Sequence, residues 1–176
     1  GRPPIYDRSA LNLSSEEIDI LIKSGKKPHW RFKLEDKKIV WTDLVKGSVS
    51  FESKNLSDPV LIREDGSLLY HLPSVIDDIE ESITDIIRGE DHITNTAFHI
   101  QIFEALNAKI PIFGHHPFLI DHEGKGLAKR LGSLSIEKIR EEGYENLTLL
   151  NYLLSIGTSS NLTKEIKSES LVKNFD

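Results

Sequence analysis

Residues 86–96 read Ile-Ile-Arg-Gly-Glu-Asp-His-Ile-Thr-Asn-Thr, and this stretch decides the fold class. Two β-branched residues precede Arg88, and Gly89 after it permits a tight turn. A helical pattern begins after the acidic pair at 90–91. A strand that ends in an arginine and turns into a helix is how open α/β sheets build ligand crevices. The guanidinium is a planar fork matched to a carboxylate, and a helix start offers free backbone N–H groups. The other interpretation of Arg88 is a surface arginine at an ordinary strand-to-helix turn.

The sequence on either side predicts an α/β protein in which the order of helices and strands changes near residue 74. Residues 1–73 read as antiparallel β-structure with one helix, which starts at a capping box formed by Ser14 and Glu17 and stops at Gly25. After residue 74, helix and strand alternate, which is typical of a parallel sheet. The expected strands lie at 29–34, 38–41, 48–51, between 58 and 66, at 68–72, 83–87, 111–113 and 117–120. The later helices are expected at 74–81, 91–107, 135–142 and 147–156, with one more in 158–176.

The long helix expected over 91–107 carries an apolar stripe. Phe98, Ile102, Ala105 and Leu106 are spaced at i, i+4, i+7 and i+8. This spacing predicts one core-facing side of the helix.

Composition bounds the class of protein. The chain has 176 residues, 28% charged and 38% hydrophobic, which is ordinary for a globular protein. It has no cysteine, which excludes disulfides and thiolate metal sites, and no apolar run approaches the ~20 residues that span a bilayer. A cytoplasmic protein with no membrane partner is therefore expected. The net charge of −6 does not indicate nucleic-acid binding.

Four ordered motifs resemble those of a known family. They are D-P-V-L-I-R-E-D-G at 58–66, Y-H-L-P-S-V-I-D-D at 70–78, I-R-G-E-D-H-I-T-N-T at 87–96 and G-K-G-L-A-K-R at 124–130. In this order and spacing they are similar to the signatures of glutamyl-tRNA synthetases, which are class I aminoacyl-tRNA synthetases. The resemblance covers roughly residues 3–157.

The resemblance implies the second half of a Rossmann-type catalytic domain. Residues 1–73 would be the inserted, antiparallel β-rich subdomain that binds the tRNA acceptor end. Residues 74–133 would be the catalytic fold with its KMSKS-like loop, and residues 134–176 the stem-contact helices. The family's first strand and H-I-G-H loop have no counterpart in the sequence. We therefore expect an internal fragment of the catalytic region that is inactive by itself.

The function implied by the resemblance is ligation of L-glutamate to tRNA through glutamyl-adenylate, with ATP as a substrate accompanied by Mg²⁺. The expected partners are L-glutamate, ATP and the acceptor stem of tRNA(Glu), and the protein is expected to be a monomer. Two alternatives stay open. One is a tRNA-modifying paralogue similar to glutamyl-queuosine synthetase, and the other is a non-catalytic tRNA-binding module.

The resemblance also implies roles for single residues. Arg88 would hold the side-chain carboxylate of the substrate glutamate, Tyr70 would flank that substrate, and Ser74 would hydrogen-bond it. The structural alternative for Tyr70 is a packed aromatic ring. Asp77 and Asp78 are interpreted as a structural pair, because class I activation needs no carboxylate base.

The ATP contacts implied by the resemblance lie further along the chain. Asp91, His92 and Leu119 would meet the nucleotide, although Asp91 could instead be an ordinary helix cap. Lys129 would act on the ATP phosphates as the catalytic residue. The KMSKS-like loop comprises Gly126, Leu127, Ala128, Lys129 and Arg130. Gly126 and Ala128 depart from the commoner lysine and serine.

No metal site is expected. His115, His116 and His122 with Asp121 are metal-binding residue types, but nothing fixes them on one helix face at ligand spacing. Tyr6 and Asp7 resemble part of a zinc pattern of some family members, in which Ala10 stands where a cysteine would be needed. We therefore expect no zinc. A Walker-type phosphate loop is excluded, because G-x-x-x-x-G-K-[ST] does not occur in the sequence.

Overall fold

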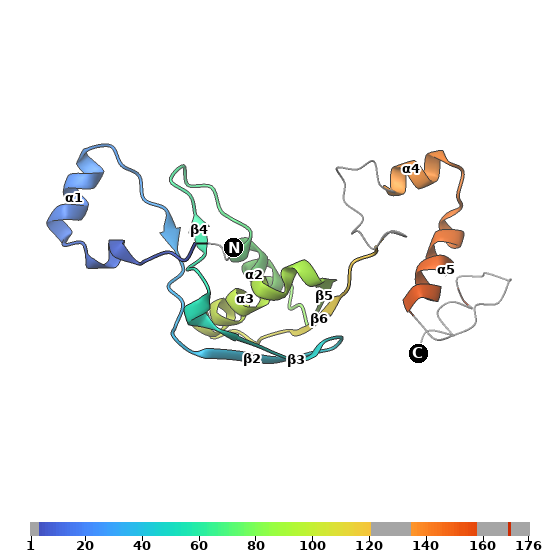
Figure 1. Ribbon diagram of the computed structural model, residues 1–176. Helices are drawn as coiled ribbons and strands as arrows, with labels where there is room; N and C mark the ends of the chain where they lie inside the picture. The colour runs from blue at the N-terminus through green and yellow to red at the C-terminus, as the bar shows by residue number, and fades with distance from the viewer. Residues whose placement is uncertain (1–3, 121–134, 158–168, 170–176) are drawn as a thin grey trace. The chain divides into compact units, whose positions relative to one another are not determined.

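A computed structural model describes residues 4–120, 135–157 and 169 (Figure 1). By its internal contacts the chain divides into two compact units, Gly1–Phe118 and Leu119–Asp176. Each unit is described by itself.

The first unit is built on a four-stranded sheet. Its strands are β2 (Lys38–Asp43), β3 (Gly47–Glu52), β5 (Asp85–Gly89) and β6 (Ile112–His116), in the order β3-β2-β6-β5. β2 and β3 form an antiparallel hairpin, whereas β6 runs parallel to both β2 and β5. The β2–β6 pairing is short, with Asp43 opposite Phe113 and the Leu44 N–H donating to the Phe113 carbonyl at 2.8 Å. The last strand of this unit therefore lies in the middle of its sheet.

Strand β2 shows why the sheet buries one face. Ile39, Trp41 and Asp43 are buried, and the residues between them are exposed. This period of two is the alternation of a strand with one face on the core. Ile39 and Trp41 join the hydrophobic core. Asp43, next in line, places a carboxylate at a core position.

A second, smaller sheet anchors the start of the chain. It pairs β1 (Trp30–Arg31) with β4 (Val60–Ile62), antiparallel. The Arg8 guanidinium grips the buried Asp58 carboxylate with two hydrogen bonds of 2.8 Å, and the Leu34 N–H donates to the same carboxylate at 3.0 Å. The first residue of the motif at 58–66 thus ties three segments together.

Two helices of the first unit lie close to their predicted positions, but two predicted strands are wrong. The segment expected as a strand at 117–120 forms none, because β6 ends at His116. α1 (Ser15–Lys23) begins at the expected capping box, with Ser14 Oγ accepting from the Glu17 N–H at 3.2 Å and Glu17 Oε2 from the Ser14 N–H at 2.8 Å. α2 (His71–Glu80) begins three residues before its prediction. The strand expected at 68–72 is consequently reduced to one bridge between Ile62 and Leu68. Pro73 permits the early start, because the N–H it lacks would be unpaired in a first helical turn.

Helix α3 (Ile93–Ala105) is buried on more sides than its apolar stripe predicts. Ile102 is buried as expected, but Ala105 and Leu106 are exposed. The buried positions are Thr96, Ala97, His99, Ile100, Gln101, Ile102 and Phe103. Figure 1 shows α2 and α3 on the same side of the sheet, and both supply residues to one core together with β2 and β6. A helix enclosed between a sheet and another helix does not present a single apolar face.

Short 3₁₀ turns connect these elements. They are η1 (Ser9–Asn12), η2 (Ser53–Asn55) and η3 (Glu90–His92). The last of these joins β5 to α3, so that β5, η3, α3 and β6 form a parallel βαβ unit.

The second unit contains α4 (Ile136–Glu141) and α5 (Asn146–Gly157), both within two residues of their predicted ends. α4 begins where Ser135 Oγ accepts from the Lys138 N–H at 3.1 Å. The helix expected in 158–176 lies outside the described residues. Across the described ranges, no helix is long and apolar enough to cross a membrane.

Candidate functional site

The Arg88 side chain is the centre of a hydrogen-bonded cluster at the end of β5. Its Nε donates to His115 Nε2 at 3.3 Å, its Nη1 to the Tyr70 hydroxyl at 2.9 Å, and its Nη2 to Thr96 Oγ1 at 2.8 Å. Below it lies the ring of Phe113, with 5.7 Å between the guanidinium carbon and the ring centroid. The cluster thus joins β5, β6, the start of α2 and the start of α3.

All three hydrogen-bond partners of Arg88 are uncharged groups or an imidazole. Burial lowers the pKa of Arg88, and the neighbouring Tyr70 and Asp78 act in the opposite direction. A guanidinium nevertheless stays protonated in proteins. Among the described residues no carboxylate forms an ion pair with Arg88. A half-buried cation without a counter-ion is matched to an anionic ligand, because such a ligand restores the charge balance lost with water.

Behind Arg88 lies a fully buried pair, Asp43 and His115. His115 Nδ1 is 2.5 Å from Asp43 Oδ2, and both side chains are 0% exposed. Asp43 Oδ1 accepts from the backbone N–H groups of His115, Val45 and Lys46, each at 3.0 Å. Burial by itself would raise the pKa of Asp43, but the hydrogen bonds from His115 and from these amides lower it well below its usual range. Asp43 is therefore an ionised acceptor.

Two further predicted residues meet the cluster. Tyr70 stands directly before α2, and its hydroxyl lies 3.3 Å from His92 Nδ1 as well as in reach of Arg88. The two rings meet edge to face, 5.4 Å apart. Asn95 approaches the same His92 nitrogen at 3.0 Å. Tyr70, Arg88 and His92 are thus together in the structure, although their roles toward substrates stay predictions.

Asp91 and Ser74 sit at the margin of this cluster. Asp91 is exposed, with Oδ2 at 3.7 Å from His92 Nε2. A Cβ on Gly89 would come within 2.7 Å of Asp91 Oδ1, so a larger residue there would displace the exposed Asp91 side chain. Ser74 is half-buried one turn into α2, where its N–H donates to the Tyr70 carbonyl at 3.1 Å. Within the described ranges, no hydrogen bond joins the Ser74 side chain to Arg88.

The remaining predicted residues lie elsewhere in the chain. Leu119 belongs to the second unit and is 46% exposed. The KMSKS-like loop with Lys129 lies outside the described residues. The predicted structural pair is placed on α2, where Asp77 is exposed and Asp78 is half-buried. Burial raises the pKa of Asp78.

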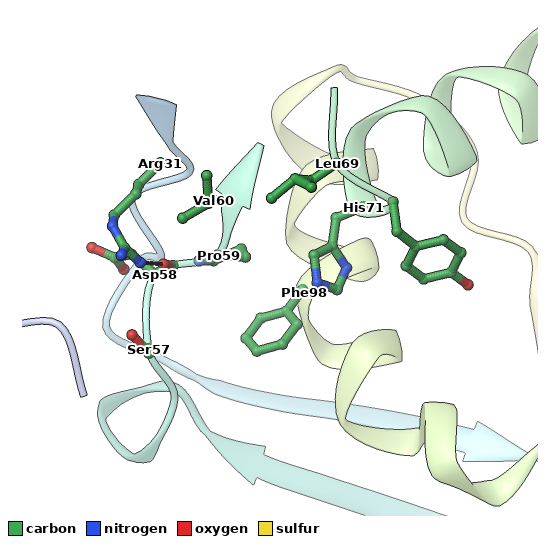
Figure 2. A pocket seen from close by; sticks show the side chains of 9 residues that line it. Arg31, Ser57, Asp58, Pro59, Val60, Leu69, His71 and Phe98 are labelled. Atoms are coloured by element: carbon green, nitrogen blue, oxygen red, sulfur yellow. Dashed lines mark hydrogen bonds between the residues drawn. The ribbon is translucent and has the colours of Figure 1, made fainter. Parts of the chain in front are cut away.

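A cavity of about 380 Å³ lies beside the cluster and reaches Tyr70. Figure 2 shows Leu69, His71 and Phe98 on one side of it, and the lining residues Arg31, Ser57 and Asp58 on the other. Because Tyr70 borders both the cavity and Arg88, it separates a polar site from a mainly apolar hollow.

Sequence reasoning missed three residues of the cluster: Asp43, Thr96 and His115. His115 was considered only as a metal ligand. In the part of the chain that the structure describes, no group of three His, Cys, Asp or Glu side chains could hold a metal ion. The sequence could have predicted that Asp43 is buried, because it continues the alternation of Ile39 and Trp41 on the core side of the strand.

Comparison with known proteins places this arrangement in a family. The family model described as "tRNA synthetases class I (E and Q), catalytic domain" matches residues 2–176. The chain belongs to this family. The α/β catalytic fold expected of a class I synthetase is thereby confirmed, and so is the family resemblance read from the motifs.

Individual relatives of this synthetase chain agree. It is 54% identical over 177 residues to a glutamate–tRNA ligase of Azospirillum brasilense, and 51% identical over 177 residues to glutamate–tRNA ligase 1 of Maricaulis maris. Both alignments cover 100% of this chain and 40% of the relative, so the chain spans two fifths of their length. A crystal structure of the glutamate–tRNA synthetase of Elizabethkingia anophelis matches with a TM-score of 0.62 and 32% identity, over 77% of this chain and 26% of that one.

Proposed function

We propose that the protein ligates L-glutamate to tRNA in an ATP-dependent reaction, acting in the cytoplasm. Its relatives carry the name of this activity, and its family uses ATP. The observation that carries the proposal is Arg88, a half-buried guanidinium whose hydrogen-bond partners within the described ranges include no carboxylate. The second carboxylate of glutamate, in its side chain, is the charge that this guanidinium lacks.

The reaction has two steps, and Arg88 acts in both by holding one end of the substrate still. An α-carboxylate oxygen of glutamate attacks the α-phosphorus of ATP, a C–O–P link forms, and pyrophosphate leaves with the electron pair. A ribose hydroxyl of the tRNA then attacks the acyl carbon, and AMP leaves. The side-chain carboxylate must take part in neither step. A bidentate contact to Arg88 keeps it occupied and fixes the position of the reacting end.

Other residues receive proposed roles around this contact. Tyr70 flanks the glutamate and Ser74 hydrogen-bonds it, while Asp91, His92 and Leu119 contact ATP. Lys129 stabilises the charge on the leaving pyrophosphate. Mg²⁺ enters with the ATP phosphates. The tRNA partner is tRNA(Glu), bound by its acceptor stem to a monomeric enzyme.

The test replaces Arg88 in the protein at the full length that its gene encodes. Arg88→Ala should lower kcat/KM for glutamate by about 10⁴, because sites built around a specific polar partner discriminate by this order when the partner goes unpaired. Arg88→Lys should recover only part, since an ammonium group cannot reproduce the fork. Steady-state aminoacylation with glutamate and with glutamine measures both.

Arg63→Ala is the matched control, because Arg63 is exposed and lies outside the cluster. It should leave the KM for glutamate unchanged. Unaltered glutamate kinetics in Arg88→Ala would reduce Arg88 to a structural turn residue. Tight tRNA binding by a wild-type protein that never charges tRNA would instead select the non-catalytic binding module.

A further inference from the structure

One edge of the Arg88 guanidinium is occupied from inside the protein. Nε–H and one Nη2–H point to His115 Nε2 and Thr96 Oγ1, which are themselves 3.0 Å apart. Both acceptor side chains are fully buried. Of the five N–H groups of a guanidinium, three are used by His115, Thr96 and Tyr70, so one on each Nη remains among the described contacts. With Tyr70 bonded to the Nη1–H on the Cδ side, the two that remain form the fork that a carboxylate accepts end-on.

The edge held by His115 requires one particular tautomer of its ring. Asp43 is an ionised carboxylate and can only accept, so His115 Nδ1 must carry the proton that joins them. The Arg88 Nε–H is a donor and faces the other ring nitrogen. In a neutral imidazole whose Nδ1 is protonated, Nε2 has a lone pair and can accept. An imidazole protonated at Nε2 would point a hydrogen at the Arg88 Nε–H.

We propose that Asp43 and His115 are positioning residues of the amino-acid site: Asp43 fixes the tautomer of His115, and the lone pair of His115 orients the Arg88 fork toward the substrate carboxylate. The proposal rests on the proposed role of Arg88. In this proposal Asp43, on β2, does not contact the substrate and acts on it through His115 and Arg88. A buried carboxylate that holds an imidazole in one tautomer is a known arrangement in other enzyme sites.

Asp43→Asn tests this with almost no change of shape. Three backbone N–H groups, those of Val45, Lys46 and His115, converge on Oδ1. They will keep the amide oxygen of asparagine at that place, so its NH₂ group must take the place of Oδ2. That group then donates to His115 Nδ1, and the ring proton moves to Nε2. A donor would face a donor at Arg88, and the fork would turn away.

The expected result is selective for one substrate. The KM for glutamate should rise by about 10- to 100-fold, the range for loss of a hydrogen bond to a charged group. The KM for ATP should stay within about threefold, because Arg88 does not touch ATP in this scheme. In an Arg88→Ala background, Asp43→Asn should add little, since the two changes remove one interaction. Asp85→Asn, the same chemical change at an exposed position of β5, should alter none of these constants.

A spectroscopic readout separates positioning from mere stability. ¹⁵N NMR of histidine-labelled full-length protein should show His115 protonated at Nδ1 in the wild type and at Nε2 in Asp43→Asn. A wild-type ring protonated at Nε2 overturns the proposal even if the variant fails to fold. So does a tautomer change that leaves the KM for glutamate unaltered. If Arg88→Ala itself leaves the KM for glutamate unaltered, the proposed role of Arg88 fails instead, and the tautomer measurement still reports on the Asp43–His115 pair.

Discussion

The hydrogen-bond partners of Arg88 leave its positive charge available for a ligand, because none of them is a carboxylate. An aspartate or glutamate in place of His115 or Thr96 would neutralise the guanidinium and compete with a ligand carboxylate. An imidazole nitrogen and two hydroxyl groups satisfy its N–H groups without cancelling its charge. The buried carboxylate of Asp43 is linked to Arg88 through the His115 ring. Orientation and charge are thus supplied by separate residues.

His99 gives the first unit an acid-sensitive core. Burial, followed by the charge of Arg88, lowers the pKa of His99 from 6.5 to about 3. Its Nδ1 atom has no hydrogen-bond partner among the described residues, and His99 is 0% exposed. The folded state therefore excludes a proton that the unfolded chain binds below pH 6.5. The free energy of unfolding must rise with pH between these two values and fall as the pH is lowered.

We expect His99 to cost the wild type about 2 kcal/mol of unfolding free energy between pH 7 and pH 5. Urea unfolding followed by tryptophan fluorescence at both pH values measures this loss. His99→Leu should lose correspondingly less, whatever its stability at pH 7. Equal losses in the two proteins would show that His99 does not carry this dependence.

At this scale the sequence predicted contacts that lie close along the chain and missed the distant ones. Arg88 and His92 fall within one motif, and the sequence analysis named both. Asp43 and His115 are 72 positions apart, and only the pairing of β2 with β6 brings them together. A single sequence carries no signal for that pairing. The importance of His115 could not be predicted without it.

Among the elements, those with a local chemical signal were predicted most accurately. The capping box fixed the start of α1, and α4 and α5 ended within two residues of their predicted ends. α3 differed because its environment is set by the sheet and by α2, not by its own pattern. Periodicity reports on one buried face, and α3 has more than one.

Helix α1 should depend on its cap more than a packed helix would. It has no buried residue, so tertiary contacts add little to its stability. Ser14→Ala removes the acceptor for the Glu17 N–H and should cost about 1 kcal/mol. Amide hydrogen exchange in α1 should accelerate by about fivefold while protection in β2 is kept. Ser50→Ala, at an exposed position of β3, is the control and should leave α1 exchange unchanged. Equal exchange in all three proteins would mean that the capping box does not hold α1.

For the whole molecule, the sheet positions the Arg88 cluster that we propose to hold the glutamate side-chain carboxylate. The sequence carries no H-I-G-H motif. A polypeptide of residues 1–176 by itself should therefore show no ATP–pyrophosphate exchange dependent on glutamate, with or without tRNA. It should still fold its four-stranded sheet, which circular dichroism and exchange protection in β2 can check. Exchange above background by this polypeptide would contradict the expectation.

The place of β6 in the middle of its sheet has a consequence for synthesis on the ribosome. β2 and β5 both emerge earlier, and each pairs with β6 along one edge. Between the emergence of Asp43 and that of His115, 72 positions later, translation at ~5–20 residues per second takes roughly 4–14 seconds. During that interval an unpaired edge of β2 is open to other chains. Chaperones should therefore protect the nascent chain most in the seconds before residue 116 leaves the exit tunnel.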